Sequence, residues 1–303
     1  MLGISAVDCL STELEKDLAY IGALVPYRTA VDVVKRFRQD TVSHTTIQKC
    51  SNKVGEEALE VKIRPLKNHK DKEHMSFQVD GGRINTIDEG WKETKTGIVE
   101  NGFDLIQTTA IVNHEKFMGE FCCEIKKQGY DTDPIIKALL SDGAKWIGDD
   151  FQKYFPRIIQ ILDYYHFKEH FCDVGKILFG ETNSKETEKW TEKLISCCFE
   201  GKISVLILRL KKEKLKHSPG SSKHEALRKL LGYVENNKHR IDYGKYQEMG
   251  LPIGSGKIEA TVKTMNNSKM KSGSIKWRLQ NANKILALRT VIFNKQFDDI
   301  KFA

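Results

Sequence analysis

Hydrophobic positions recur at helical spacing in the first part of the chain. From residue 14 to 58 apolar side chains return every three or four positions, with breaks at 26–28 and 40–43. Ser43 is suited to cap a helix over 44–57, and Ala30, Val34 and Phe37 line one face of the helix before it. We therefore predict a helical segment over residues 1–60. Its outline is that of a DNA-binding helix-turn-helix, and an ordinary helical hairpin has the same pattern.

A polar stretch and then a strand pattern follow this segment. Residues 61–73 are rich in charge, which is typical of a solvated linker. Residues 74–84, 91–99 and 102–112 are rich in β-formers, which predicts three consecutive antiparallel strands. A helix over 114–128, a strand over 135–140, a helix over 144–154 and a strand over 158–162 complete the pattern. This order predicts an α/β fold with a mixed sheet covered by helices on both faces.

The remainder of the chain is predominantly helical. The helical pattern is nearly continuous from 164 to 249, with loops at 180–185 and 217–222. Gly254-Ser255-Gly256 then opens another helix, and a last helix is predicted over 277–294. We interpret the block from about 180 to 250 as an all-helical insertion in a domain that spans residues 74–303.

Composition narrows the class of protein. The chain has 49 Lys and Arg against 41 Asp and Glu, a formal charge of +8, which favours a polyanionic partner, although solubility alone also explains such a charge. Seven cysteines without Cys-x-x-Cys spacing argue against a disulfide framework and a thiolate zinc site, and indicate a reducing cytosol. The longest apolar stretch, 203–208, is too short to span a bilayer, so no membrane association is expected.

Three acids stand in settings that favour metal binding. Asp80 lies in the first predicted strand, Asp142 follows the fourth, and Glu259 lies in the helix after the glycine-rich turn. The ends of adjacent strands are common ligand sites in such sheets, and Mg²⁺ prefers carboxylate oxygens. Together the acids predict a cage for two Mg²⁺ or Mn²⁺ ions that clamps the attacking and leaving oxygens of a phosphodiester.

Each acid also has an ordinary interpretation. Asp-Gly is a common turn dipeptide, so Asp80 and Asp142 could simply end strands. Glu259 could form a surface ion pair with Lys263, one helical turn later. Taken singly, each acid fits these interpretations better than metal ligation, and only their combination on one sheet favours a metal site.

His166 is a fourth candidate, directly after the fifth predicted strand. An imidazole near a scissile phosphate can orient a nucleophile or donate a proton. A histidine flanked by aromatic residues at a helix start is more often structural. Asp163 could cap that helix or fix the histidine tautomer.

Basic residues gather after Glu259. Cations beside a carboxylate site could follow a DNA backbone, and a solvated basic face explains the same charges equally well. The candidate DNA contacts are Lys263, Lys269, Lys271, Lys276 and Arg278.

Several segments resemble a known family. DGAKWI, FPRIIQILDYYHFKEH and GLPIGSGKIEATVKTMNNSKMKSGSIKW are similar to the catalytic domain of bacterial insertion-sequence transposases with a DDE triad, most closely the Kra type. Residues 21–58 resemble that group's helix-turn-helix region. The resemblance implies a ribonuclease-H-like fold, Asp80, Asp142 and Glu259 as the metal-binding triad, and His166 at an Asp-x-x-His position. It also implies cutting and joining of double-stranded DNA at element ends by a dimer, in the bacterial cytoplasm at the nucleoid.

Similar proteins usually carry a further N-terminal region with cysteine pairs suited to zinc, whereas this chain begins just before the helical segment. We expect either a downstream start or one piece of a split or decayed element, in which chemistry could survive while recognition of the element ends is lost. The predicted function is therefore DDE transposition. A non-catalytic DNA-binding remnant and a metal-dependent nuclease without strand transfer are the alternatives.

Overall fold

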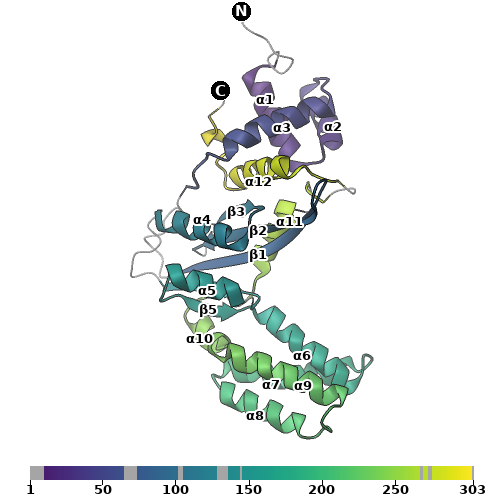
Figure 1. The fold of residues 1–303 in the computed structure, drawn as a ribbon, viewed down its shortest axis with the longest axis vertical. Helices are drawn as coiled ribbons and strands as arrows, with labels where there is room; N and C mark the ends of the chain where they lie inside the picture. The colour runs from purple at the N-terminus through teal and green to yellow at the C-terminus, as the bar shows by residue number, and fades with distance from the viewer. Residues whose placement is uncertain are drawn as a thin grey trace, which may run out of the picture. The chain divides into compact units, whose positions relative to one another are not determined.

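A computed structural model describes residues 10–64, 74–101, 105–127, 136–143, 145–266, 269–271 and 275–301. Contacts divide the chain into two compact units. Figure 1 labels the helices and strands along the chain. The first unit holds the described parts of Met1–Asp71, Val79–Thr132 and Lys257–Ala303. The second unit holds those of Lys72–Gln78 and Asp133–Gly256.

A five-stranded sheet with the order β3-β2-β1-β4-β5 carries the fold. Its strands β2 and β3 are antiparallel, whereas β1, β4 and β5 run parallel to one another. The sheet confirms the predicted α/β class with a mixed sheet and is consistent with a ribonuclease-H-like fold. The strands are β1 (His74–Thr86), β2 (Gly90–Glu100), β3 (Leu105–Ala110), β4 (Ile136–Ser141) and β5 (Ile159–Leu162).

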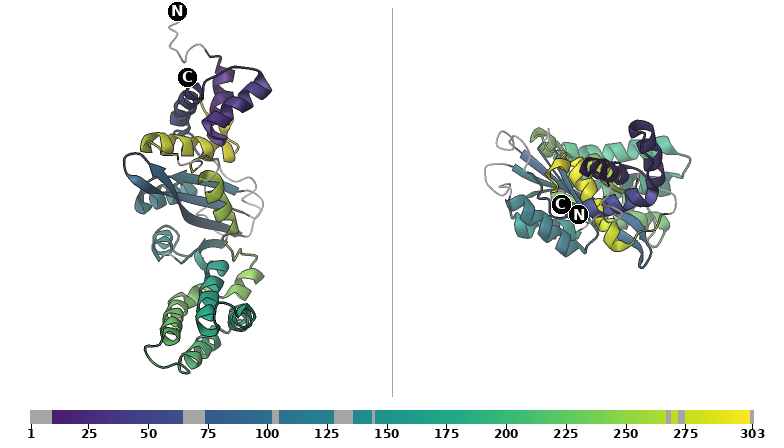
Figure 2. Two further views of the ribbon diagram at one scale, coloured as in Figure 1. Left: turned by 90° about the vertical axis from the view of Figure 1, so that its right-hand side faces the viewer. Right: turned by 90° about the horizontal axis from the view of Figure 1, so that it is seen from above.

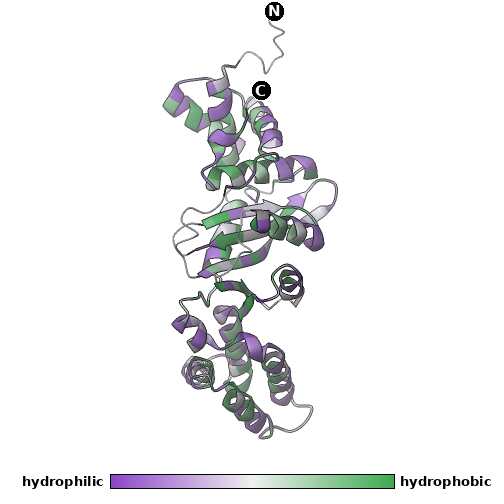
Figure 3. Cartoon of the chain, turned by 90° about the vertical axis from the view of Figure 1, so that its left-hand side faces the viewer, coloured by the Kyte–Doolittle hydropathy of each residue, from purple (hydrophilic) through white to green (hydrophobic). Residues whose placement is uncertain are grey.

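The predicted elements agree with the structure to within a few residues. The predicted ends at 102–104, 128, 135 and 144 lie outside the described residues. Helices α4 and α5 follow β3 and β4 as the alternation of patterns predicts, and they cover His114–Lys127 and Lys145–Tyr154. In Figure 3 hydrophobic and hydrophilic segments alternate along the helices, which is the pattern from which they were predicted.

The N-terminal helices share a hydrophobic core with the last helix of the chain. Helices α1 (Thr12–Leu24), α2 (Tyr27–Arg38) and α3 (His44–Ala58) gather beside α12 (Leu279–Phe293), as Figure 2 shows. Leu18 and Ile47 from this group pack with Leu288 from α12, and all three side chains are fully buried. The segment therefore depends for its burial on residues at the other end of the sequence.

Details of this helical group test the capping and periodicity arguments. The Ser43 hydroxyl accepts a hydrogen bond from the Thr46 amide at 3.0 Å, which confirms the predicted cap of α3. Ala30 and Val34 are fully buried, whereas Phe37, which follows on the same helical face, is 81% exposed and lies outside the core. Phe37 lies in the last turn of α2, just before Gln39 turns the chain in a left-handed conformation with φ of 60°.

The predicted domain boundaries stay a prediction. Most of the linker predicted over 61–73 lies outside the described residues, which resume at residue 74. The shared core nevertheless joins residues 1–60 to the C-terminal part of the domain predicted over 74–303. The N-terminal helices thus share one compact unit with the C-terminal residues.

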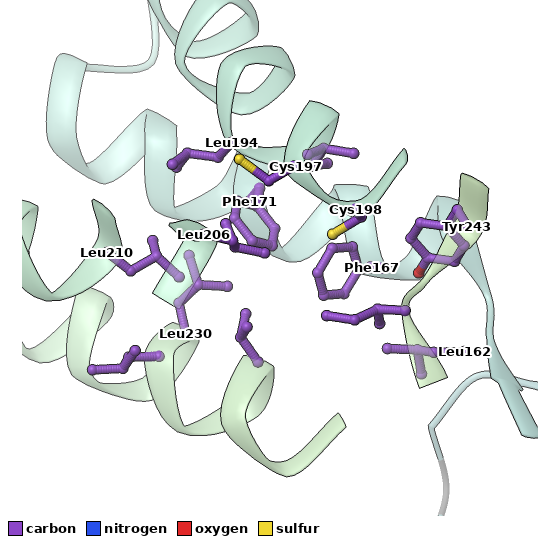
Figure 4. Close-up of a cluster of buried hydrophobic side chains, with 14 of the residues drawn as sticks. Leu162, Phe167, Phe171, Leu194, Cys197, Cys198, Leu206, Leu210, Leu230 and Tyr243 are labelled. Atoms are coloured by element: carbon purple, nitrogen blue, oxygen red, sulfur yellow. The ribbon is translucent and has the colours of Figure 1, made fainter. Parts of the chain in front are cut away.

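The second unit is built largely from helices around one apolar core. Figure 4 shows Phe167 and Phe171 of α6 meeting Leu206 and Leu210 of α8 in this core. The block predicted as a helical insertion, about 180–250, is helical apart from short loops, one of which turns at Gly201 with φ of +67°. Helix α6 (Tyr164–Phe179) precedes the block. The block itself contains α7 (Ser184–Phe199), α8 (Ile203–Lys214), α9 (Ser222–Asn237) and α10 (Tyr243–Glu248), with the 3₁₀ turn η2 (Lys238–Arg240).

The starts of the last two helices were also predicted, and one of the two predictions is correct. Helix α11 covers Gly256–Asn266, as the glycine-rich turn predicts. Trp277 does not start the last helix, because it forms a parallel bridge to Thr86 and its indole donates to the Met270 carbonyl at 2.9 Å. The indole is buried, so Trp277 is part of the core. No helix in the described ranges is long and apolar enough to cross a bilayer.

Candidate functional site

A buried carboxylate organises the start of α6. Asp163 is fully buried, and its Oδ1 accepts hydrogen bonds from the His166 amide at 2.6 Å and from its ring Nδ1 at 3.0 Å. The other carboxylate oxygen accepts from the Ser255 amide in the glycine-rich turn before α11. Asp163 therefore caps α6, orients the imidazole and fixes the turn with one side chain. Both roles predicted for it are present together.

The electrostatics of His166 favour its protonated form. Burial alone would lower the pKa of His166, but the hydrogen bond and charge of Asp163, with smaller contributions from Asp142 and Glu169, raise it above the ordinary 6.5. The side chain remains 44% exposed, so the ring is accessible to a substrate. A ring bound through Nδ1 to a carboxylate presents Nε2 for proton donation or ligation.

Asp142 follows β4 in an exposed turn of the second unit. Its neighbour Ser141 is the last residue of β4 and accepts a 2.7 Å hydrogen bond at Oγ from Nη2 of Arg240. Arg240 belongs to η2 and is only 4% exposed, and its Nη1 donates to Asn237 at 3.4 Å. Burial lowers the pKa of Arg240, partly offset by the charge of Asp142. The helical block thus brings a buried cation to the strand end that carries Asp142.

The Tyr233 side chain of α9 lies close to the end of β4. A Cβ on Gly143, the residue after Asp142, would lie 3.7 Å from the Tyr233 hydroxyl, and Gly143 itself has φ of +99°. Neither that hydroxyl nor Nε of Arg240 has a hydrogen-bond partner within the described part of the chain. The His170 ring stands 4.3 Å from the Tyr233 ring, centroid to centroid. Two polar atoms with unused hydrogen-bonding capacity therefore belong to side chains at the strand end that precedes Asp142.

Asp80 and Glu259 belong to the first unit. Asp80 lies on β1, half-buried, and its Oδ1 accepts from the Gly81 amide at 2.7 Å. Glu259 lies in the first turn of α11 with Lys263 at 4.0 Å, which is the surface pair proposed as its ordinary interpretation. Gln78 of β1 and Leu140 of β4 are partners in the parallel register. Asp80 and Asp142 each follow one of these partners by two residues.

The side chains at the end of α11 are fixed against β1 and β2. A Cβ on Gly82 would lie 2.1 Å from the Asn266 side-chain nitrogen, so only glycine permits this approach. The buried Asn266 amide also donates to the Thr94 hydroxyl at 3.0 Å. Helix α11, which carries Glu259, is thereby held on the strand that carries Asp80.

Metal binding by the triad stays a prediction. In the residues that the structure describes, no three His, Cys, Asp or Glu side chains are grouped so as to hold a metal ion. Asp80 and Glu259 belong to the first unit and Asp142 to the second. All three are carboxylates, the donor type that Mg²⁺ and Mn²⁺ prefer.

One of the predicted DNA contacts is wrong. Lys263, Lys271, Lys276 and Arg278 are exposed, as a DNA contact or a solvated face requires. Lys269 is only 1% exposed and therefore cannot reach a phosphate from its position. Sequence position alone does not distinguish a buried lysine from an exposed one.

The buried ammonium of Lys269 has partners of its own. Its Nζ donates to the Val25 carbonyl at 2.9 Å and lies 3.1 Å from the centroid of the Tyr27 ring. Burial and the charge of Arg289 lower its pKa to about 7. Lys269 thus fixes the turn between α1 and α2 and is a structural residue.

Helix α2 offers a separate basic surface. Arg28, Lys35 and Arg36 are exposed on this helix, and the exposed Phe37 lies beside Lys35 and Arg36 in its last turn. Such a surface suits the predicted helix-turn-helix role, which stays a prediction.

No sequence motif pointed to Arg240 or Tyr233. Both lie inside a helical block that was assigned no chemistry, and arginine and tyrosine are ordinary residues in amphipathic helices. The arrangement of η2 beside Ser141 is what brings Arg240 to the strand end.

Comparisons with known proteins add little to this geometry. No protein-family model matches the chain, and no curated protein matches it. Among solved structures, the chain is similar to one titled "Crystal structure of NurA", with 12% identity and a TM-score of 0.14. The alignment covers 86% of this chain and 66% of that one, so this chain spans slightly less than two thirds of its length. A TM-score this low carries no argument.

Proposed function

We propose that this chain is a DDE-type transposase that cleaves DNA and transfers the cut strand at the ends of an insertion sequence. The observation that carries the proposal is the imidazole of His166, held at Nδ1 by the buried Asp163 and influenced by the charge of Asp142. A histidine fixed by a carboxylate and placed near an exposed acid suits proton transfer at a phosphodiester.

The positions of the three acids on the fold support the same proposal. Asp80 and Asp142 come at the same two-residue interval after paired residues of parallel strands, and Glu259 follows the helical block in α11. The proposal assigns all three to one reaction, with a dimer on double-stranded DNA at the bacterial nucleoid. Asp142 follows the end of β4, where α/β sheets commonly bind ligands, whereas Asp80 lies within β1.

Within this proposal Asp80, Asp142 and Glu259 would hold Mg²⁺ or Mn²⁺. A bound ion would neutralise charge on the phosphodiester and lower the pKa of an attacking water. His166, with its raised pKa, would donate a proton from Nε2 or orient the attacking group. Arg240 would hold the end of β4 through Ser141, and the exposed Lys271 and Arg278 would position the DNA backbone.

Cleavage assays with Asp142→Asn test the proposal. The substrates are duplexes from the DNA flanking the gene, with Mn²⁺, and the readout is nicking together with duplex binding. We expect Asp142→Asn to lose cleavage and retain binding, whereas the control Asp149→Asn, an exposed acid on α5, retains both. Undiminished cleavage by Asp142→Asn would refute the assignment of the triad.

A non-catalytic DNA-binding protein is the second candidate. The exposed basic residues Arg28, Lys35 and Arg36 on α2 favour it, because they require no metal to bind DNA. Duplex binding by the wild type without cleavage in Mg²⁺ or Mn²⁺ would select this candidate. A third outcome, hydrolysis without joining of a pre-cut 3′-hydroxyl end, would indicate a nuclease without strand transfer.

A further inference from the structure

Helix α8 carries apolar side chains on two faces. Leu206 and Leu210 are fully buried in the core of the second unit, where Figure 4 shows them. On another face Val205, Leu208 and Leu215 are 37%, 51% and 80% exposed, the last directly after the helix end. Within the described residues, only one of the two apolar faces is therefore covered.

The exposed residues follow the spacing of a helix-pairing seam. Positions 205, 208, 212 and 215 are separated by three, four and three residues, which places them in one line along a helix. Lys212 occupies the third position and is exposed, with no ion-pair partner in the described part of the chain. We call Val205, Leu208, Lys212 and Leu215 the α8 stripe.

Basic residues flank the α8 stripe on both sides. Lys216 lies along one edge and Lys211 along the other, at positions that face a partner helix in a coiled coil. Arg209 lies on the same edge as Lys216, but its Nη1 donates to the Lys193 carbonyl of α7 at 3.0 Å. Lys211 pairs with Glu235 at 2.9 Å and Lys216 with Glu213 at 2.7 Å. Exposed ion pairs of this kind contribute little stability, so these lysines can exchange partners at low cost.

We propose that the α8 stripe binds an acidic amphipathic helix of a partner protein. Leu208 and Leu215 would pack against the apolar face of that helix, and one of its carboxylates would form an ion pair with Lys212. A second copy of α8 would bring basic flanks against basic flanks, which disfavours pairing between copies. DNA has no apolar face for Leu208 and Leu215 to enter. The stripe is also narrower than the apolar face of a membrane-binding helix and contains a lysine.

Two synthetic helical peptides test the proposal on the full chain. The first has leucine at seam positions and glutamate at flanking positions and opposite Lys212, and the second has lysine in place of every glutamate. Fluorescence anisotropy gives the dissociation constants. We expect the glutamate peptide to bind at least tenfold more tightly than the lysine peptide, and a scrambled glutamate peptide to bind as weakly as the lysine peptide.

Variants assign binding to the stripe. Leu208→Gln should weaken binding of the glutamate peptide at least tenfold, and Lys212→Glu should reverse the preference between the peptides. The control Ile87→Gln removes a comparably exposed aliphatic side chain, 56% exposed, from the β1–β2 turn and should change nothing. Far-UV circular dichroism verifies that each variant is folded.

Four results would overturn the proposal. Equal binding of the scrambled and designed glutamate peptides would indicate charge attraction alone. Self-association in sedimentation experiments that Leu208→Gln abolishes would assign the stripe to a second copy. Binding to anionic phosphatidylserine vesicles that Leu208→Gln abolishes would assign it to a membrane. Unchanged peptide affinity in Leu208→Gln would place the binding elsewhere.

Discussion

Lys269→Met should stabilise the first unit and change how its stability depends on pH. Lys269 has its ordinary pKa of 10.5 in the unfolded chain and a pKa of about 7 in the folded protein, lowered by burial and by Arg289. The unfolded chain therefore binds more protons between these two values, so stability rises with pH through that window. Below it the buried lysine imposes its full cost, because the folded protein must then accommodate an ammonium.

The magnitude follows from the two pKa values. A difference of about 3.5 pKa units corresponds to ~5 kcal/mol, at 1.36 kcal/mol per unit. Methionine has a similar length without a charge, but it forfeits the hydrogen bond to the Val25 carbonyl and the contact with the Tyr27 ring. Those contacts contribute about 1 kcal/mol each. We therefore expect Lys269→Met to raise the free energy of unfolding by ~2–3 kcal/mol at pH 7.

Urea unfolding followed by circular dichroism between pH 7 and 9.5 measures this effect. The advantage of Lys269→Met over wild type should shrink by about 1.4 kcal/mol for each pH unit. The control Lys271→Met removes an exposed lysine and should show no such trend. A stability difference between Lys269→Met and wild type that is constant across this range would refute the assignment of a lowered pKa to Lys269.

Three further substitutions test other parts of the structure. Asp163→Asn should lower the pKa of His166 toward or below 6.5, and NMR titration of the imidazole measures it; an unchanged titration would contradict the role of Asp163. Ser141→Ala leaves Nη2 of Arg240 without its 2.7 Å acceptor and should cost about 2 kcal/mol in urea unfolding, whereas a neutral effect would show that Arg240 finds another partner. Gly82→Ala forces a Cβ against Asn266 and should cost about 1–3 kcal/mol by the same measurement, and an unaltered midpoint would contradict that close approach.

Most of the fold could be predicted because local patterns determine it. The Ser43 cap, the strand of β4 and the helix after Gly254-Ser255-Gly256 all depend on residues close in sequence. The sharing of a core between α3 and α12 could not be predicted, since no local pattern names the partner of an apolar face. The burial of Lys269 escaped prediction for the same reason.

The candidate site was predictable only in part. Asp163 and His166 form a local motif, so their hydrogen bond follows from spacing in a capped helix. Arg240 reaches Ser141 across 99 residues of sequence, a contact that exists only once the helices of the second unit are assembled. Convergence of the three acids likewise depends on tertiary structure, and it stays a prediction.

The core shared by the N-terminal helices and α12 has a consequence for synthesis of the chain. Ribosomes add about 5–20 residues per second, so the ~220 residues between α3 and α12 take roughly 10–45 s to emerge. During that interval Leu18 and Ile47 lack the side chain of Leu288 that covers them in the finished protein. The nascent chain therefore presents an apolar surface that chaperones can bind, and a truncated translation product would keep that surface exposed permanently.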